Sequence, residues 1–290
     1  MKRIAIVTVL VLMLLAGLAI GCTEKGLTED EVNQIVTKVL DTNSTVKTCQ
    51  FKLSLQEVLR VERARLEADN STQDIVNMSA SGAGTLDSQN KAMKMVMSMT
   101  VDAPGEDKQN IPVETYLVDG VMYTRVSVQG SDQWMKMVMP EGIWEKQNEL
   151  YQQSDLLSMA EDVKYLGVEN VDGTECYLVE VTPSSENLKE LLSGLEMLDV
   201  PGLDTSKLNL ADIIKEISFK QWVAKDSYLF VKTTQHMSME MRPEDFGATE
   251  ADFQKMIVSA DTEMVFFGYN EPISIQLPGE ALEAVEVTGN

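Results

Sequence analysis

The sequence predicts an α+β fold built around a long antiparallel β-sheet, and three observations support this class. Apolar residues recur at every second position over much of residues 76–182, which is the period of a half-buried strand. Asp-Gly pairs at residues 119–120 and 172–173 interrupt these runs, and Asp-Gly supplies the positive φ angles of a two-residue hairpin turn. Stretches with helical spacing stand before and between the strand-like runs, as is typical of an α+β domain.

The chain begins with the pattern of an export signal. Residues 1–3 are a short basic segment, and residues 4–20 are uncharged and mostly apolar. The Cys22 that follows Gly21 resembles the lipobox cysteine of bacterial and archaeal lipoproteins. That resemblance implies a signal peptide over residues 1–21, a lipid on Cys22, and a tether over residues 22–27 that spans roughly 12 Å. The alternative is an uncleaved transmembrane anchor, because the apolar stretch nearly reaches a bilayer span.

A helix is expected directly after this tether. Residues 28–31 read Thr-Glu-Asp-Glu, which is a capping box, and apolar residues follow at helical spacing at Val32, Ile35, Val36 and Val39. Residues 48–53 then alternate as a strand does. Residues 55–66 fit a helix or a long exposed strand equally well.

The later elements follow the same two periods. Residues 143–159 have helical spacing, and residues 224–227 are expected to turn between strands at 219–223 and 228–233. The remaining expectations are a helix after Ser185, a short helix capped by Asn209 and bearing Ile213, Ile214 and Ile217, and closing strands at 263–269 and 273–277. No break in composition divides residues 28–290, so we expect one domain there.

Composition and charge exclude several classes of function. A net charge of −22 argues against a nucleic-acid partner, because affinity for nucleic acid rests on Lys and Arg. A single histidine, His236, leaves little from which to build a metal site or a Ser-His-Asp enzyme. The sequence contains no phosphate-binding loop, dinucleotide fingerprint, EF-hand loop or Cys-x-x-Cys pair. We therefore expect no cofactor, no bound metal and no enzymatic activity.

Methionines supply the candidate binding residues. They occupy alternate positions in three runs: Met93, Met95, Met97 and Met99; Met135, Met137 and Met139; and Met237, Met239 and Met241. Alternate residues of a strand share one face of the sheet, so each run forms a methionine row. The rows have three interpretations. They are core residues packed beneath helices, or the lining of a cavity that accepts flexible acyl chains, or soft ligands for Cu(I), for which supporting Cys and His ligands are scarce.

Two further cysteines, Cys49 and Cys176, leave two alternatives open. An exported compartment permits a disulfide between them, and it would close a long loop. The other alternative is a pair of buried reduced thiols, because sequence spacing alone does not fix disulfide geometry.

Three segments resemble one family, the LolA/LppX-like exported lipoproteins. Residues 162–183 are similar to its segment in which Glu-x-Val-x-Gly precedes a Cys-Tyr strand. Residues 221–229 resemble its Trp-containing hairpin, although Ala224-Lys225 stands where that pattern has a single Asp, and residues 266–273 resemble its closing Tyr-Asn-x-Pro strand. The resemblance implies a strongly curved antiparallel half-barrel, helices covering the concave face, and an apolar cavity between them.

The resemblance also implies a function. Members of this family carry lipids or lipoproteins outside the membrane, and a related group senses envelope stress. We therefore expect an exported lipoprotein, anchored to the outer face of the cytoplasmic membrane, that binds a lipid or acyl chain in an apolar cavity. The alternative is an interaction or envelope-sensor lipoprotein with the same fold, no ligand, and another envelope protein as its partner.

Overall fold

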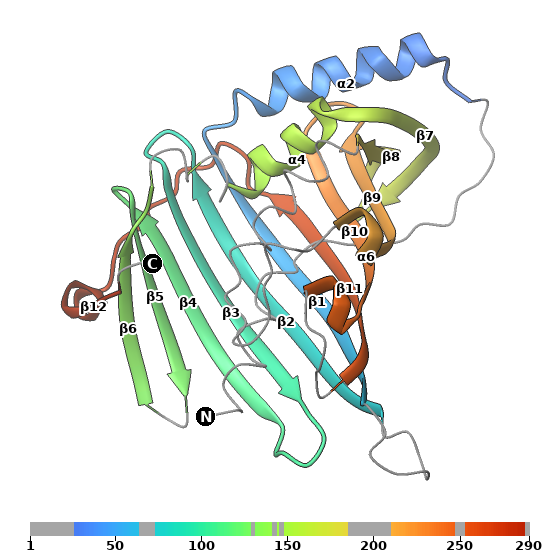
Figure 1. Cartoon of the computed structure of the whole chain (residues 1–290). Coiled ribbons are helices and arrows are strands. Elements are labelled where there is room, and N and C mark those ends of the chain that lie inside the picture. Colours follow the sequence, from blue (N-terminus) through green and yellow to red (C-terminus); the bar gives the residue numbers. More distant parts are fainter. Residues whose placement is uncertain are drawn as a thin grey trace.

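The computed structural model describes residues 26–63, 73–128, 131–140, 144, 148–184, 210–246 and 253–287. Twelve strands in these residues form one curved, unclosed sheet in the order β12-β6-β5-β4-β3-β2-β1-β11-β10-β9-β8-β7 (Figure 1). Neighbouring strands are antiparallel throughout, except that β12 runs parallel to β6. The predicted antiparallel sheet is therefore confirmed.

The sheet consists of two meanders that meet at β1 and β11. In the first, β1 (Thr48–Arg63), β2 (Gln73–Asp87), β3 (Ala92–Asp102), β4 (Gln109–Val118), β5 (Val121–Val128) and β6 (Ser131–Val138) pair in chain order. In the second, β7 (Ala160–Val171), β8 (Thr174–Pro183), β9 (Ile214–Ala224), β10 (Phe230–Met241) and β11 (Phe253–Phe267) do the same. The pairing of β11 with β1 joins the two meanders into one sheet.

The predicted hairpins form where the turn residues stand. Asp119 and Gly120 join β4 to β5 with φ angles of 52° and 74°. Asp172 and Gly173 join β7 to β8 with φ angles of 49° and 92°. Both pairs therefore adopt the positive φ angles that two-residue hairpins require. The turn after Ala224 is also confirmed, and it joins β9 to β10.

Helix α2 (Glu29–Asn43) begins at the predicted capping box. The Thr28 hydroxyl accepts a hydrogen bond from the Glu31 amide at 3.3 Å, and the Thr28 amide donates to the Glu31 carboxylate at 2.8 Å. These bonds lower the pKa of Glu31. The helix buries Val32, Ile35 and Val39, which is the stripe that the helical spacing predicts.

Two further helices precede β7 and β9 in the chain. Helix α4 (Glu149–Ser158) is capped by Asn148, whose side-chain oxygen accepts hydrogen bonds from the amides of Leu150 and Tyr151 at 3.0 and 3.2 Å. Helix α6 (Leu210–Ile213) is one turn long. Figure 1 shows α2 and α4 at one end of the sheet and α6 beside β9 and β10.

Several sequence expectations need correction or lie outside the described residues. The ambiguous segment after Leu55 is strand as far as Arg63. Residues 273–277 are not a strand, and the chain instead closes with the 3-10 helix η3 (Gly279–Glu283) and β12 (Val285–Glu286). Ile214 and Ile217 belong to β9 rather than to a helix. The signal segment, Cys22, the helix after Ser185 and Asn209 fall outside the described residues. None of the helices described is long and apolar enough to cross a membrane.

The buried residues lie mainly on the inner face of the sheet, which carries the odd-numbered residues of β1 from Cys49 to Val61. At the end covered by α2 and α4, a helix-side cluster contains large aliphatic and aromatic side chains, among them Val39, Phe51, Leu117, Leu157 and Phe266. Further along the same face lies a second cluster, called here the methionine cluster: Leu55, Leu59, Val76, Met78, Ala80, Met99, Ile111, Ile213, Met237, Met239, Met241, Val258 and Ala260.

Gly84 on β2 makes room for Phe51 in the helix-side cluster. Gly84 stands opposite Phe51 in the β1–β2 register, and a Cβ atom added at Gly84 would lie 2.1 Å from the Phe51 ring. Phe51 is fully buried and packs against Phe266 with a ring-centroid distance of 6.4 Å. A side chain at position 84 therefore requires the buried Phe51 ring to move.

We expect Gly84→Ala to lower the free energy of unfolding by about 1–3 kcal/mol, because it overpacks this core site. Phe51→Leu in the same chain removes the ring and relieves the clash, so the double variant loses less than the sum of the two single losses. Urea unfolding of all three variants measures this coupling. Gly279→Ala, with nothing within 4 Å of the added Cβ, is the control. Additive single effects would contradict the account.

Candidate ligand-binding face

The three predicted methionine rows lie on the same face of the sheet. Opposite residues of paired strands share a face, and Met99 on β3 stands opposite Ala80 on β2, which stands opposite Leu55 on the inner side of β1. On the other side of β1, Met237 on β10 stands opposite Ala260 on β11, which stands opposite Glu57. The strand register thus brings rows that are far apart in sequence onto one surface.

Four further methionines join this surface, and they were not predicted because none of them belongs to a run of alternating methionines. Met78 faces Glu57 across β1–β2, and Met256 faces Met241 across β10–β11. Met122 and Met264 occupy inner positions of β5 and β11. We call the whole set the methionine face: Met78, Met93, Met95, Met97, Met99, Met122, Met135, Met137, Met139, Met237, Met239, Met241, Met256 and Met264.

The structure does not gather all of these side chains in one place. Met93 and Met264 belong to the helix-side cluster, and Met95, Met97, Met122 and Met139 pack against it. Met78, Met99, Met237, Met239 and Met241 belong to the methionine cluster, with Met256 packed against it. Met135 and Met137 on β6 are half-buried and belong to neither cluster.

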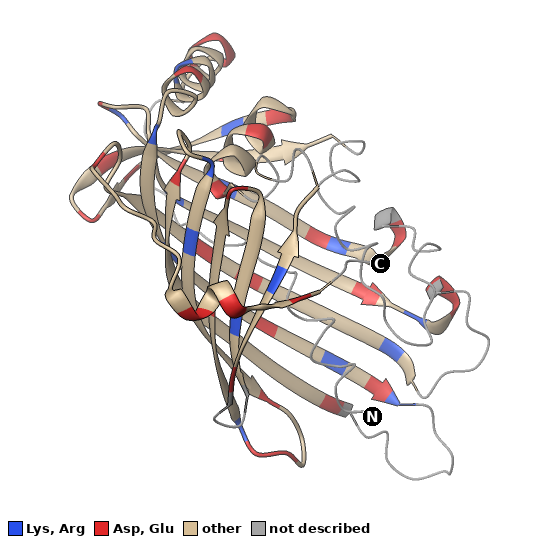
Figure 2. Cartoon of the chain, turned by 90° about the vertical axis from the view of Figure 1, so that its left-hand side faces the viewer, with Lys and Arg blue, Asp and Glu red and all other residues tan. Residues whose placement is uncertain are grey.

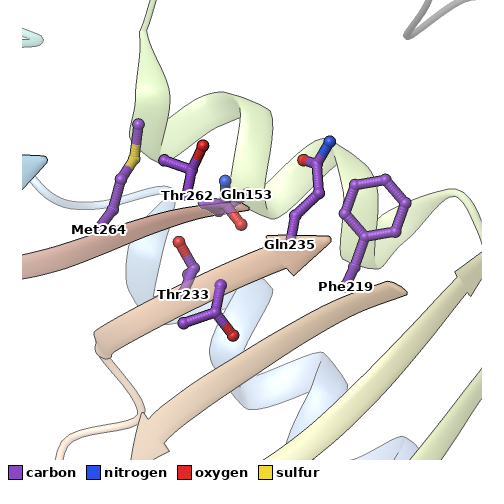
Figure 3. A pocket seen from close by; sticks show the side chains of 7 residues that line it. Gln153, Phe219, Thr233, Gln235, Thr262 and Met264 are labelled. Atoms are coloured by element: carbon purple, nitrogen blue, oxygen red, sulfur yellow. The ribbon is translucent and has the colours of Figure 1, made fainter. Parts of the chain in front are cut away.

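A polar seam lies beside α4 on the inner face, and we define it by Gln153, Gln221, Thr233, Gln235 and Thr262. All five residues are buried. The Gln221 side-chain amide donates to the Gln153 backbone oxygen at 3.0 Å and side-chain oxygen at 3.2 Å, which ties β9 to α4. Four of the five, together with Phe219, Thr234 and Met264, line a cavity of about 10 Å³, which is close to the size of one water molecule (Figure 3).

Glu57 is the one acidic side chain among the inner-face positions of β1 from Cys49 to Val61. It is 1% exposed, and neither carboxyl oxygen has a hydrogen-bond partner within the described part of the chain. Burial raises the pKa of Glu57 to about 8, because a carboxylate loses its hydration there. Its neighbours across the sheet are Met78 and Ala260, so a neutral carboxyl group stands within an apolar surface.

Glu57 was not among the residues predicted from the sequence, although its position carries a signal. Phe51, Leu53, Leu55, Leu59 and Val61 mark the inner positions of β1 with a period of two, and Glu57 falls in phase with them. Charged residues in phase with an apolar stripe are expensive to bury and often functional. Residues 55–66 fitted a helix or a strand equally well, and only a strand places residue 57 on the same face as residues 55 and 59. The position of Glu57 among the inner residues was therefore not evident.

The two remaining cysteines do not form a disulfide, and both are buried free thiols. Cys49 points to the inner face, in the helix-side cluster, whereas Cys176 packs with Leu178 and Trp222 on the other face of the sheet. Four inter-strand steps separate β1 from β8, which amounts to roughly 19 Å, while a disulfide needs Cα atoms within about 7 Å. Burial raises the pKa of Cys49 to about 12 and that of Cys176 to about 11.

Charged side chains on the strands lie mainly on the outer face, where they pair with each other. Arg125 bridges Glu114 at 2.8 Å and Asp132 at 3.1 Å, and Lys255 bridges Glu240 at 2.8 Å. Figure 2 shows Lys, Arg, Asp and Glu scattered along the strands between long uncharged stretches. His236 lies on this outer face, 2.9 Å from the Asp261 carboxylate. The described residues contain no group of three or more His, Cys, Asp or Glu side chains arranged to hold a metal.

A family model described as "Family of unknown function (DUF6612)" matches residues 31–286. A comparison with curated proteins found no match. The solved structures that resemble this chain include Mycobacterium tuberculosis lipoprotein LppX, with 13% identity, a TM-score of 0.40, and coverage of 86% of this chain and 100% of the LppX chain. LprF from Mycobacterium bovis has 11% identity, a TM-score of 0.44, and coverage of 88% and 99%. LppX is thus among the similar structures, as the sequence resemblance predicts.

Glu57 makes the stability of the fold depend on pH. The folded chain keeps its proton up to about pH 8, whereas the unfolded carboxyl loses its proton near the ordinary value of 4.5. Between these values the folded state binds more protons, so the free energy of unfolding falls as pH rises. We expect this fall to reach at most about 1.4 kcal/mol per pH unit from this one group.

Urea unfolding between pH 5 and pH 8 measures the effect. Glu57→Gln carries no proton to lose, so its curve is flatter and it gains stability relative to the parent chain as pH rises. Glu149, whose pKa burial raises to about 7, contributes in the same direction in both proteins. Parallel curves for parent and variant would contradict the assignment.

Because the thiols of Cys49 and Cys176 are buried, we expect them to react slowly with thiol reagents. A maleimide reagent at neutral pH is expected to leave Cys49 and Cys176 unlabelled in the folded protein, because both thiols are buried and protonated. In denaturant without reductant, both become labelled, which peptide mass spectrometry detects. A linked Cys49–Cys176 peptide in the unreduced digest would show that the assignment is wrong.

Proposed function

We propose that this chain, which belongs to the family described as "Family of unknown function (DUF6612)", is an exported lipoprotein that binds a hydrophobic ligand on its methionine face. The observation that carries the proposal is the convergence of three separated methionine rows, and of four single methionines, on one face of one sheet. Thioether side chains are unbranched and polarisable, so they fit acyl chains of varied shape. Burying such a ligand contributes roughly 25 cal/mol per Å² of apolar surface.

The arrangement of polar groups supports the same proposal. Charges on the strands gather on the outer face, and the inner face combines an apolar surface with a few uncharged hydrogen-bonding groups in the polar seam. Small-molecule sites typically have this composition, an apolar lining with few convergent polar groups. Helices α2 and α4 pack at one end of the face. We propose that helices also cover the rest of the concave side, so that the ligand is enclosed between the sheet and the helices.

Membrane attachment is the second part of the proposal. Cys22 follows a lipobox-like segment, and residues 22–27 leave only a short tether before α2 begins at Glu29. Two or more acyl chains on Cys22 give stable anchoring, which a single chain does not. A domain held this close to the outer face of the membrane exchanges lipid with it over a short distance.

The second candidate is an interaction or sensor lipoprotein whose inner face is a filled core. The burial of Met99, Met237 and Met239, each 8% exposed or less, favours it. The two functions differ in whether the purified protein retains lipid. Measuring the lipid that co-purifies with the protein therefore distinguishes them.

Native mass spectrometry of detergent-extracted protein is expected to show bound lipid. Met97→Trp places a bulky indole on the inner side of β3 and is expected to reduce lipid occupancy several-fold. Val96→Trp, the control, puts the same side chain one residue away on the outer side, where Val96 is 45% exposed. Lipid-free parent protein under mild extraction would favour the sensor function instead. Equal lipid occupancy in the two variants would show that the methionine face does not form the binding site.

A further inference from the structure

We infer that Glu57 recognises the polar end of the ligand: its carboxyl O–H donates a hydrogen bond to a carbonyl oxygen of an uncharged acyl lipid, such as a fatty-acid ester. The inference rests on the proposed function and names its ligand class. It follows from the position, burial and surroundings of this side chain, which the folding of the sheet alone does not explain.

The position of Glu57 is costly to the fold. Its side chain stands between Met78 and Ala260 in the strand register, both its oxygens are unpartnered in the described residues, and the residue is 1% exposed. An unsatisfied buried polar group lowers the stability of the folded state, because it gives up hydrogen bonds to water without replacing them. Outer-face acids such as Glu114 and Glu240 are instead paired with Arg or Lys. A hydrogen bond from a bound ligand satisfies the carboxyl group where the protein does not.

The surroundings of Glu57 favour an uncharged partner. Burial keeps the carboxyl group protonated at neutral pH, so it offers one strong O–H donor. No Lys or Arg stands among the described inner-face residues that flank Glu57 on β1, β2, β10 and β11. On β1 and β11 these flanking positions run from Leu55 to Leu59 and from Val258 to Thr262. An anionic headgroup there lacks a counter-charge, whereas the carbonyl oxygen of an ester needs only a donor.

The neighbouring residues orient such a ligand. Ala260 opposite Glu57 carries only a methyl group. Met78, Met99, Met237 and Met239 surround this part of the face with apolar thioethers. On the other side, Thr262 of the polar seam is a diagonal neighbour of Glu57 across β1–β11, at about 7–8 Å in such pairs. The acyl chain then lies on the methionine cluster, with its carbonyl group at the border of the seam.

Two matched probes test the inference, methyl palmitate and hexadecane. Each is titrated against delipidated full-length protein that carries the fluorescent reporter N-phenyl-1-naphthylamine, and displacement gives relative affinities. The parent protein is expected to prefer the ester about tenfold over the alkane, the effect of one buried hydrogen bond. Glu57→Leu is expected to lose this preference, because ester affinity falls about tenfold while alkane affinity stays within about twofold.

Two variants control this comparison. Glu57→Gln keeps a donor in its amide group and is expected to keep the ester preference within about threefold. Gln56→Leu, an exposed neighbour on the outer side of β1, is expected to leave both affinities unchanged. Circular dichroism establishes that each variant is folded. Glu57→Leu removes an unpaired polar group, so it is expected to fold at least as stably as the parent.

The outcomes separate the two proposals. An ester preference that survives in Glu57→Leu, or is lost in Glu57→Gln, overturns the inference but leaves hydrophobic binding intact. A parent protein that binds reporter and alkane yet shows no ester preference also overturns it. Failure of the parent protein to bind the reporter or either lipid refutes the proposed function, and the inference with it.

Discussion

The antiparallel pairing of β1 with β11 is the contact on which the rest of this structure depends. It runs from Gln50–Phe267 to Arg63–Phe253 and joins two meanders that are otherwise separate along the sheet. Because residues opposite each other share a face, this register puts the Met237–Met241 row of β10 on the same face as the inner residues of β1, and β2 carries the alignment on to Met99. A slip of one residue between β1 and β11 would put the Met237–Met241 row on the opposite face from the rows of β3 and β6.

The inner face is divided by chemistry as well as by position. Beneath α2 and α4 it is built from rings and branched chains, with Phe51 and Phe266 in contact and Gly84 leaving room for them. Such a core specifies one packing, which suits a structural role. Beyond the polar seam, methionines are five of the 13 buried residues of the methionine cluster, against two of 20 in the helix-side cluster, and thioethers specify packing weakly and adapt to shape. Rigidity at one end and adaptability at the other are compatible with a site that accepts flexible chains.

Local sequence patterns predicted much of this fold. The features that they did not predict depend on pairing between strands that are far apart in the sequence. The Thr28 capping box, the Asp-Gly hairpins and the methionine alternation each concern residues a few positions apart, where sterics and hydrogen bonding act directly. The partnership of β1 with β11 spans most of the chain and leaves no local signature. Glu57 was missed because its phase depends on a strand that the local pattern left ambiguous. The separation of Cys49 from Cys176 follows from strand order, which spacing does not encode.

The central claim is that an acyl ligand lies on the methionine cluster, and the methyl groups of these residues report on it directly. In protein labelled with ¹³C at the methionine methyl groups, methyl palmitate is expected to shift the resonances of Met78, Met99, Met237 and Met239 together, with a common saturation curve. Met159, in the turn after α4, lies outside the face and serves as internal reference. Shifts confined to Met159, or no shifts at saturating lipid, would contradict the account.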